Sequence, residues 1–202
     1  MNEMFSYFIS IYIKFFFLLT PFFVLSMFLS LTKEMPLPSR HRTAMRVAMA
    51  IIAITFVLYF FGNTIFKIFD ITVDSFRVGA GCLLFLSAVA LVHDKGAAPS
   101  SHREGDLAVV PLAIPIAVGP GTTGALLVMG AEISHTWQKA TGCAALLMAA
   151  LTVGGLLWVG TAIEKWIGRQ GILILSKLTG LMISALAARI VFTGVRNLLL
   201  NP

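Results

Sequence analysis

The sequence predicts an all-α integral membrane protein, on the evidence of its composition and its long apolar segments. The chain has 202 residues, of which 58% are hydrophobic and only 12% are charged, and its mean hydropathy is +0.91. Soluble domains have about 25% charged residues, so this chain has too little polar surface for a soluble globule. A membrane helix needs about 20 apolar residues, and the length accommodates about six of them. We therefore expect one polytopic membrane domain over residues 1–202.

Polar breaks divide the chain into six apolar segments. We expect membrane helices at about 5–31, 44–61, 74–92, 107–131, 140–162 and 172–196. Prolines and basic residues predict a loop over Thr32–Arg46. The polar stretch 93–106 is the expected linker between two halves of three helices each, about 1–92 and 107–202.

The basic residues are distributed unevenly and predict the orientation of the chain. Lys and Arg together number 15 and Asp and Glu 9, which gives a formal net charge of +6. The loops after the first, third and fifth segments hold most of this excess, at Lys33, Arg40, Arg42, Arg46, Lys95, Arg103, Lys165 and Arg169. By the positive-inside rule these loops are cytoplasmic, so we expect both termini on the periplasmic side of a bacterial inner membrane. No basic stripe of the kind that binds nucleic acid is left over.

The two halves share residues at a nearly constant offset, which indicates an internal repeat. Four matches relate them: Thr20-Pro21 to Gly119-Pro120 and Gly81 to Gly180 at 99 positions, and Gly62 to Gly160 and Lys67 to Lys165 at 98. Because each half has an odd number of helices, a duplication would place the second half upside down in the membrane. Such inverted repeats are typical of secondary transporters.

The strongest local signal is the stretch PLAIPIAVGPGTTG, residues 111–124, which places three prolines inside the fourth segment. Proline removes a backbone donor, so we expect this helix to break near Gly119-Pro120 and a new half-helix to begin at Pro120. Thr20-Pro21 predicts a matching break in the first segment. Unpaired backbone groups are tolerated at membrane depth only inside protein or beside water.

These two breaks form the candidate substrate site. The N–H groups of Gly121, Thr122 and Thr123 would face the gap, where a helix N-terminus favours an anion such as a carboxylate. Carbonyl groups near Leu19 and Thr20 would accept an ammonium group. The alternative is that both breaks are kinks that let small residues pack closely, without any substrate site.

Few ionisable residues lie inside the segments. Lys14, Arg77, Lys177 and Arg189 fit roles as interfacial anchors, buried pairing partners or substrate contacts, and the sequence does not choose among these roles. Common nucleophile, zinc-protease and phosphate-binding motifs are absent. The two cysteines have no further ligand at metal spacing. We expect a protein that is not an enzyme and that binds no cofactor or metal.

Three segments carry a resemblance to a known family. Residues 76–92 read FRVGAGCLLFLSAVALV, residues 109–123 read VVPLAIPIAVGPGTT, and residues 20–32 read TPFFVLSMFLSLT. They resemble, in this order, the segments Phe-Arg-x-x-Gly-Gly-x-Leu-Leu-Phe, Pro-Leu-Ala-Ile-Pro with Ala-Gly-Pro-Gly, and Asn/Asp-Pro-x-Gly-x-x-Pro-x-Phe of the MarC (UPF0056) integral membrane proteins. The resemblance implies an inner-membrane protein similar to the family's neutral amino acid transporters, some of which are described as exporting alanine or glycine.

The match to the family pattern is uneven. The family residues that recur here are Arg77, Gly81, Pro111, Pro115, Gly119, Pro120 and Gly121. Around the first break the chain departs from the pattern, with Thr20 in place of Asn/Asp, Phe23 in place of Gly and Ser26 in place of the second Pro. Ala80 replaces the first residue of the Gly-Gly pair. We therefore expect the first break to be lined differently from that of other members.

The expected function is secondary transport of small neutral amino acids, exporter-like, through a site at mid-membrane between the two broken helices. The candidate substrate-binding residues are Thr20, Pro21, Arg77, Gly119, Pro120, Gly121, Thr122 and Thr123. The expected partners are a small zwitterionic substrate and the lipid bilayer, without nucleic acid. The alternatives are a membrane scaffold or partner subunit that does not transport, and a channel.

Overall fold

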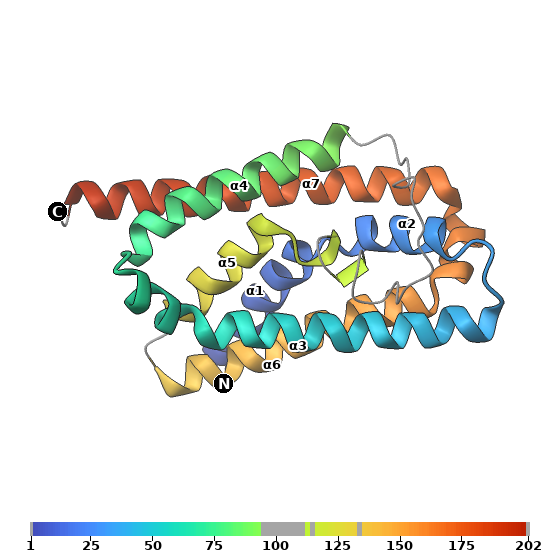
Figure 1. Ribbon diagram of the computed structural model, residues 1–202, viewed down its shortest axis with the longest axis horizontal. Helices are drawn as coiled ribbons and strands as arrows, with labels where there is room; N and C mark the ends of the chain where they lie inside the picture. The colour runs from blue at the N-terminus through green and yellow to red at the C-terminus, as the bar shows by residue number, and fades with distance from the viewer. Residues whose placement is uncertain (1, 94–111, 114–115, 133–134, 201–202) are drawn as a thin grey trace.

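The computed structural model describes residues 2–93, 112–113, 116–132 and 135–200, and within these ranges every regular element is helical (Figure 1). The first half contains α1 (Asn2–Leu18), α2 (Pro21–Leu31), α3 (Leu37–Phe69) and α4 (Val73–His93). The second half contains α5 (Pro120–Ala131), α6 (Thr136–Trp158) and α7 (Gly160–Leu200). The predicted all-α class is therefore confirmed.

Five helical stretches of the described chain are long and apolar enough to cross a membrane. They are Met4–Leu31, Leu37–Gly62, Val73–His93, Thr136–Trp158 and Gly160–Leu200. These stretches agree with five of the six predicted segments. Of the fourth segment, 107–131, the structure describes residues 112–113 and 116–131, which include α5. Most of the expected linker (94–106), together with Pro111 and Pro115, lies outside the described residues.

The helices in the first half extend beyond the apolar segments. α3 begins at Leu37, so the predicted loop over Thr32–Arg46 is wrong beyond residue 36. Pro38 lies in the first turn of α3, where a missing N–H group breaks no helical hydrogen bond. The helix ends at Asp70, which adopts left-handed angles of φ 51° and ψ 40°. With 33 residues, α3 is about 50 Å long and exceeds the hydrocarbon core of about 30 Å.

The predicted boundary between the last two segments is also corrected. α6 ends at Trp158 and α7 begins at Gly160, so residues 160–162 of the predicted fifth segment belong to α7. α7 bends at Gly168, whose φ of 75° and ψ of 161° are accessible almost only to glycine. Hydropathy did not resolve this junction because apolar side chains continue through it.

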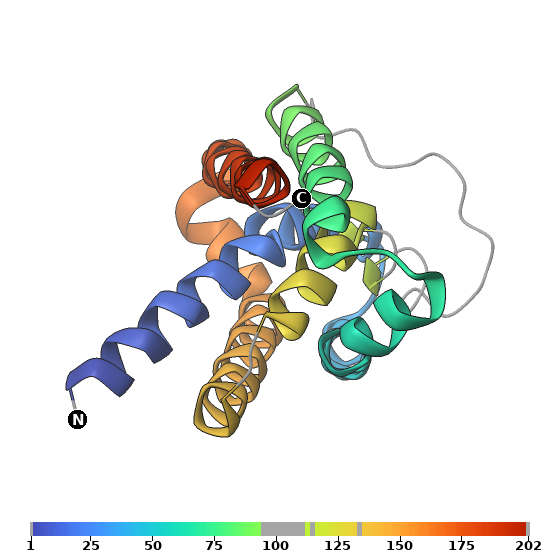
Figure 2. The same ribbon diagram turned by 90° about the vertical axis from the view of Figure 1, so that its left-hand side faces the viewer.

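The helices pack around a centre formed by the broken segments. α4 lies beside α7 and α3 beside α6, while α5 packs on both α3 and α4 (Figure 1). α1 packs on α6 and α2 on α7, and the end-on view shows α5 between the outer helices (Figure 2). The α3–α4 turn, the C-terminal end of α5 and the chain's C-terminus share one end of the bundle, called the Asp70 end. The α2–α3 and α6–α7 junctions share the opposite end, called the Gly168 end.

α4 and α7 approach each other closely through small residues. A Cβ atom on Gly81 would lie 2.6 Å from Cγ2 of Val191, and one on Gly180 would lie 3.0 Å from Cγ2 of Val92. The same two positions face the carbonyl oxygens of alanines on the other helix. The α4 residues in this contact stand 99 positions before their α7 counterparts: Gly81, Ala88 and Val92 before Gly180, Ala187 and Val191.

Candidate functional site

The first predicted break is confirmed between α1 and α2. Thr20 joins the two helices with left-handed angles of φ 48° and ψ 52°, which are unusual for a β-branched residue. It is the N-cap of α2, yet its hydroxyl group makes no capping bond. The residue is only 7% exposed, and its Oγ1 has no hydrogen-bond partner among the described residues. A buried unpaired hydroxyl costs about 1–3 kcal/mol, so the position needs an explanation, and a ligand that pairs with the hydroxyl would supply one.

The second predicted break is confirmed before α5. Gly119 is the extended N-cap, with φ −79° and ψ 176°, and Pro120 is the first helical residue. The helical ladder starts with the Thr123 N–H group, which donates to the Gly119 carbonyl at 2.8 Å. The N–H groups of Gly121 and Thr122 therefore precede the ladder, as at any helix N-terminus. The prediction that the Thr123 N–H group also faces the gap is wrong, because this group donates within the helix. In α2 the equivalent bond is donated by the Val24 N–H group to the Thr20 carbonyl at 3.0 Å. Both half-helices therefore begin with a proline after their N-cap, although Thr20 is left-handed and Gly119 is extended.

The structure brings the two breaks into direct contact. The Thr122 hydroxyl donates to the carbonyl of Leu18, the last residue of α1, at 3.2 Å in a buried bond between residues 104 positions apart. Gly121 packs on the backbone of α4, where a Cβ atom would lie 2.5 Å from Cα of Leu84. The N-terminus of α5 is therefore enclosed by α1 and α4 at the centre of the bundle.

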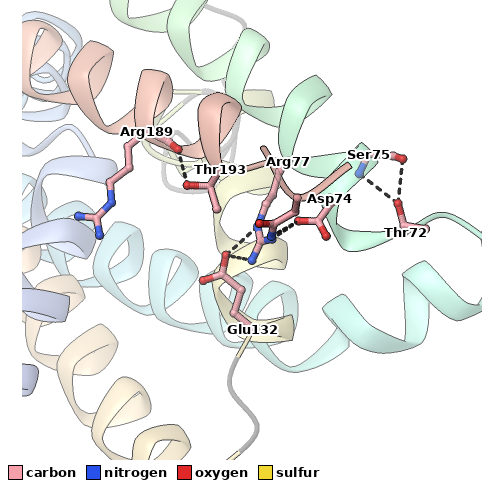
Figure 3. Close-up of polar contacts among 8 residues, drawn as sticks. Thr72, Asp74, Ser75, Arg77, Glu132, Arg189 and Thr193 are labelled. Atoms are coloured by element: carbon pink, nitrogen blue, oxygen red, sulfur yellow. Dashed lines mark hydrogen bonds and ion pairs between the residues drawn. The ribbon is translucent and has the colours of Figure 1, made fainter. Parts of the chain in front are cut away.

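Arg77 lies in the first turns of α4, at the Asp70 end, and Figure 3 shows it beside Asp74 and Glu132. Its Nε donates to Glu132 at 2.9 Å, and its guanidinium group also forms ion pairs with Asp74 and Glu132. Asn197 of α7 donates to the same Asp74 carboxylate at 3.0 Å. Arg77 thus joins α4 to the C-terminal ends of α5 and α7. The structure does not bring it together with the other candidate substrate residues, because α5 separates Glu132 from the break by about 18 Å.

Two polar clefts lie at opposite ends of the bundle. The Arg189 cleft, of about 230 Å³, lies at the Asp70 end, and its polar lining consists of Lys14, Arg77, Glu132, Arg189 and Thr193. The Arg169 cleft, of about 120 Å³, lies at the Gly168 end, and its polar lining consists of Ser26, Ser30, Lys33, Arg40, Glu164 and Arg169. Three lining residues of the Arg169 cleft stand 99 positions before three of the Arg189 cleft: Leu29, Ser30 and Lys33 before Val128, Met129 and Glu132.

The remaining basic residues of the segments divide between the cleft and the surface. Lys14 and Arg189 line the Arg189 cleft, whereas Lys177 is exposed on α7. Sequence reasoning singled out Lys14 and Arg189 but not their common cleft, because they come from segments 175 positions apart. Among the residues that the structure describes, no group of three His, Cys, Asp or Glu side chains could hold a metal ion.

Together these features define a polytopic α-helical membrane protein in which the break at Thr20 meets the N-terminus of α5 at the centre of the bundle. The chain belongs to the MarC family: the model of the MarC family integral membrane proteins matches residues 5–199. A UPF0056 membrane protein of Methanocaldococcus jannaschii is 32% identical and covers 96% of this chain and 98% of its own length. The UPF0056 membrane protein YhcE of Escherichia coli is 25% identical over 93% of each chain, and a Pyrococcus horikoshii UPF0056 protein is 28% identical over 98% of each. No solved structure matches the chain significantly.

Proposed function

We propose that the protein is a secondary transporter of the bacterial inner membrane that moves small neutral amino acids, in the direction of export. The contact between Thr122 and Leu18 carries this proposal, because it joins two broken helices at the centre of the bundle. Secondary transporters bind their substrates at such breaks, where half-helix N-termini face anionic groups and unwound carbonyls face cations.

The residues at the breaks suit a zwitterion. The free N–H groups of Gly121 and Thr122 and the unpaired hydroxyl of Thr20 would bind a carboxylate. The carbonyl groups of Leu18, the last residue of α1, and of Leu19, which follows it, would accept an ammonium group, since the last carbonyls of a helix lack helical partners. At Leu18 the ammonium group would replace or share the bond from the Thr122 hydroxyl. The close approach of Gly121 to α4 limits the space, which favours a substrate with a small side chain.

The proposed layout is a pair of inverted three-helix repeats, and the helix contacts support it. In this layout α2 corresponds to α5 and α4 corresponds to α7. The contact of α2 with α7 is then the counterpart of the contact of α5 with α4, and both are present. The reciprocal glycine contacts of α4 and α7 and the equivalent cleft residues follow the same offset of 99 positions. In this layout the basic Gly168 end is cytoplasmic and both termini are periplasmic.

In the described structure Leu18, Thr20 and Thr122 are all buried, at 0%, 7% and 6% exposure. A transporter would have to separate Thr122 from Leu18 to expose the site to either side. The alternative is a membrane scaffold without transport, and the close packing at Gly121 favours it. Cysteines at positions 20 and 122, in a chain without its native cysteines, distinguish the two functions. If a water-soluble thiol reagent modifies these cysteines and added alanine slows the modification, the result supports a transporter. If neither cysteine reacts, the result supports a scaffold.

The deciding experiment measures flux through the purified protein in lipid vesicles. Radiolabelled alanine, glycine, serine and threonine are tested, with empty vesicles as the control. Thr122→Ser keeps the hydroxyl group and should retain flux, whereas Thr122→Val should reduce it at least tenfold. The folding of each variant is checked by size-exclusion chromatography. Folded protein that moves none of the four amino acids would contradict the proposal.

A further inference from the structure

Two basic side chains lie in parts of the chain that would otherwise contact lipid. Arg189 stands eleven residues, about 16 Å, before the end of α7, and Lys14 stands four residues before the end of α1. A charge at the centre of a membrane helix costs about 2.5–3.5 kcal/mol on insertion scales unless it reaches water or a partner. Both side chains line the Arg189 cleft, which gives each of them access to a polar space.

The nearby carboxylates are already paired. Asp74 and Glu132 both form ion pairs with Arg77, and Figure 3 draws no ion pair to the guanidinium group of Arg189. Within the described ranges, neither Lys14 nor Arg189 has a carboxylate oxygen within the 4.0 Å of a salt bridge. The described lining of the cleft thus holds three basic side chains, Lys14, Arg77 and Arg189, against the single carboxylate of Glu132, which is paired with Arg77. This excess of positive charge favours an anion in the cleft.

The cleft also lies beside the proposed path of the substrate. Lys14 precedes Thr20 by six residues, about 9 Å of helix rise, and Met129 follows Pro120 by nine residues, about 14 Å. The cleft is thus built on the same two broken segments that meet at the centre. A solute that moves between the Asp70 end and the breaks would pass these side chains.

We propose that the Arg189 cleft binds the carboxylate group of a small solute, with Lys14 and Arg189 as its ligands. This inference rests on the proposed function, because it makes the transported amino acid the solute and gives it a second site before or after the centre. A guanidinium group matches a carboxylate with two parallel hydrogen bonds, and an ammonium group adds a point charge. At about 230 Å³ the cleft is smaller than the roughly 300–1,000 Å³ of pockets for drug-sized ligands, which restricts it to small solutes.

The first test measures the potential of the cleft without any ligand. Thr193→Cys, in a chain with Cys82 and Cys143 replaced by serine, places a single thiol in the cleft. When each rate is divided by the reagent's rate with a small free thiol, the anionic reagent sulfonatoethyl methanethiosulfonate should react faster than its cationic trimethylammonium analogue. This ratio of anionic to cationic relative rates should fall about tenfold in the double variant Lys14→Gln/Arg189→Gln. Tenfold is the low end of the range by which charged clefts concentrate ions of opposite charge.

Two controls keep this test decisive. Lys67→Gln removes an exposed charge at the same end, outside the Arg189 cleft, and should leave the ratio unchanged. Raising the salt concentration from 0.1 M to 1 M shortens the Debye length from about 10 Å to 3 Å, so it should reduce the ratio of relative rates in the single-cysteine parent. This control uses the parent alone and therefore does not depend on folding of the double variant. Equal relative rates for the two reagents in the parent would overturn the proposal.

The second test measures carboxylate binding in the cleft and asks whether the bound group belongs to a free solute or to a lipid. Glycine and acetate should slow modification of Thr193→Cys in a saturable way, and methylamine should not. Lys14→Gln and Arg189→Gln should each raise the half-protecting glycine concentration about tenfold, which corresponds to about 1.4 kcal/mol. Nanodiscs of phosphatidylcholine alone and nanodiscs with phosphatidylglycerol separate a solute from a lipid headgroup. Protection that needs phosphatidylglycerol and ignores glycine would overturn the proposal.

The two proposals fail in different ways. Protection by glycine without flux of any amino acid would contradict transport and leave the cleft site standing. Flux with an unchanged KM in Lys14→Gln and Arg189→Gln, together with no protection by glycine, would contradict the cleft site and leave transport standing.

Discussion

Alanine at Gly81 tests the contact between α4 and α7 with a single methyl group. In an exposed helix interior, Gly→Ala stabilises by about 1 kcal/mol. At Gly81 the new Cβ would lie 2.6 Å from Cγ2 of Val191 and 3.2 Å from backbone atoms of α7, so the Val191 side chain must shift and the α7 backbone must give by a few tenths of an ångström. Overpacking of this kind costs about 1–3 kcal/mol. We expect Gly81→Ala to be about 1–3 kcal/mol less stable than Gly79→Ala, because Gly79 has no atom within 4 Å of such a Cβ.

The same reasoning predicts a reciprocal pair of double-mutant cycles. Val191→Ala should relieve Gly81→Ala, and Val92→Ala should relieve Gly180→Ala, each with a coupling energy of at least about 0.5 kcal/mol. The crossed pair Gly81→Ala with Val92→Ala should be additive. Equilibrium unfolding by sodium dodecyl sulfate in mixed micelles measures each free energy. If Gly81→Ala were as stable as Gly79→Ala, or the crossed pair coupled as strongly as the direct one, the described contact would be wrong.

Three further substitutions have expected effects on the free energy of unfolding in the same assay. Thr20→Asn should stabilise by about 1 kcal/mol, since asparagine tolerates the left-handed angles better than a β-branched residue; a loss of stability would contradict the assigned backbone. Thr122→Val should destabilise by about 1–3 kcal/mol relative to Thr122→Ser, because it leaves the Leu18 carbonyl unpaired; equal stability would exclude that bond. Arg77→Gln should destabilise the protein by about 1–2 kcal/mol, a value between the effects of breaking exposed and buried ion pairs. In a chain that already carries Glu132→Gln the same substitution should cost less, and an equal cost in both chains would exclude the pair.

The helix breaks could be predicted from the sequence because their cause is local. Pro120 and Pro21 lack an N–H group whatever surrounds them, so a break before each follows from the residue type. The left-handed angles of Thr20 also suit the family pattern, which has Asn or Asp at this position, the residues that tolerate such angles best. Sequence reasoning therefore located both breaks to the residue.

The helix ends and the cleft could not be predicted in the same way. Hydropathy marks the lipid-embedded part of a helix, whereas α3 continues through Arg40, Arg42 and Arg46 before it reaches the apolar segment. Pro38 suggested a loop, but a proline in the first turn is equally compatible with a helix start. The Arg189 cleft depends on how α1, α4, α5 and α7 pack, and no local pattern records that arrangement. For the same reason no sequence pattern predicts that Arg77 pairs with Glu132.

Flux of labelled alanine, glycine, serine and threonine through the purified protein in lipid vesicles tests the central proposal most directly. The account predicts saturable flux of at least one of these amino acids, retained by Thr122→Ser and reduced at least tenfold by Thr122→Val. Folded wild-type protein that moves none of them, at the rate of empty vesicles, would contradict it.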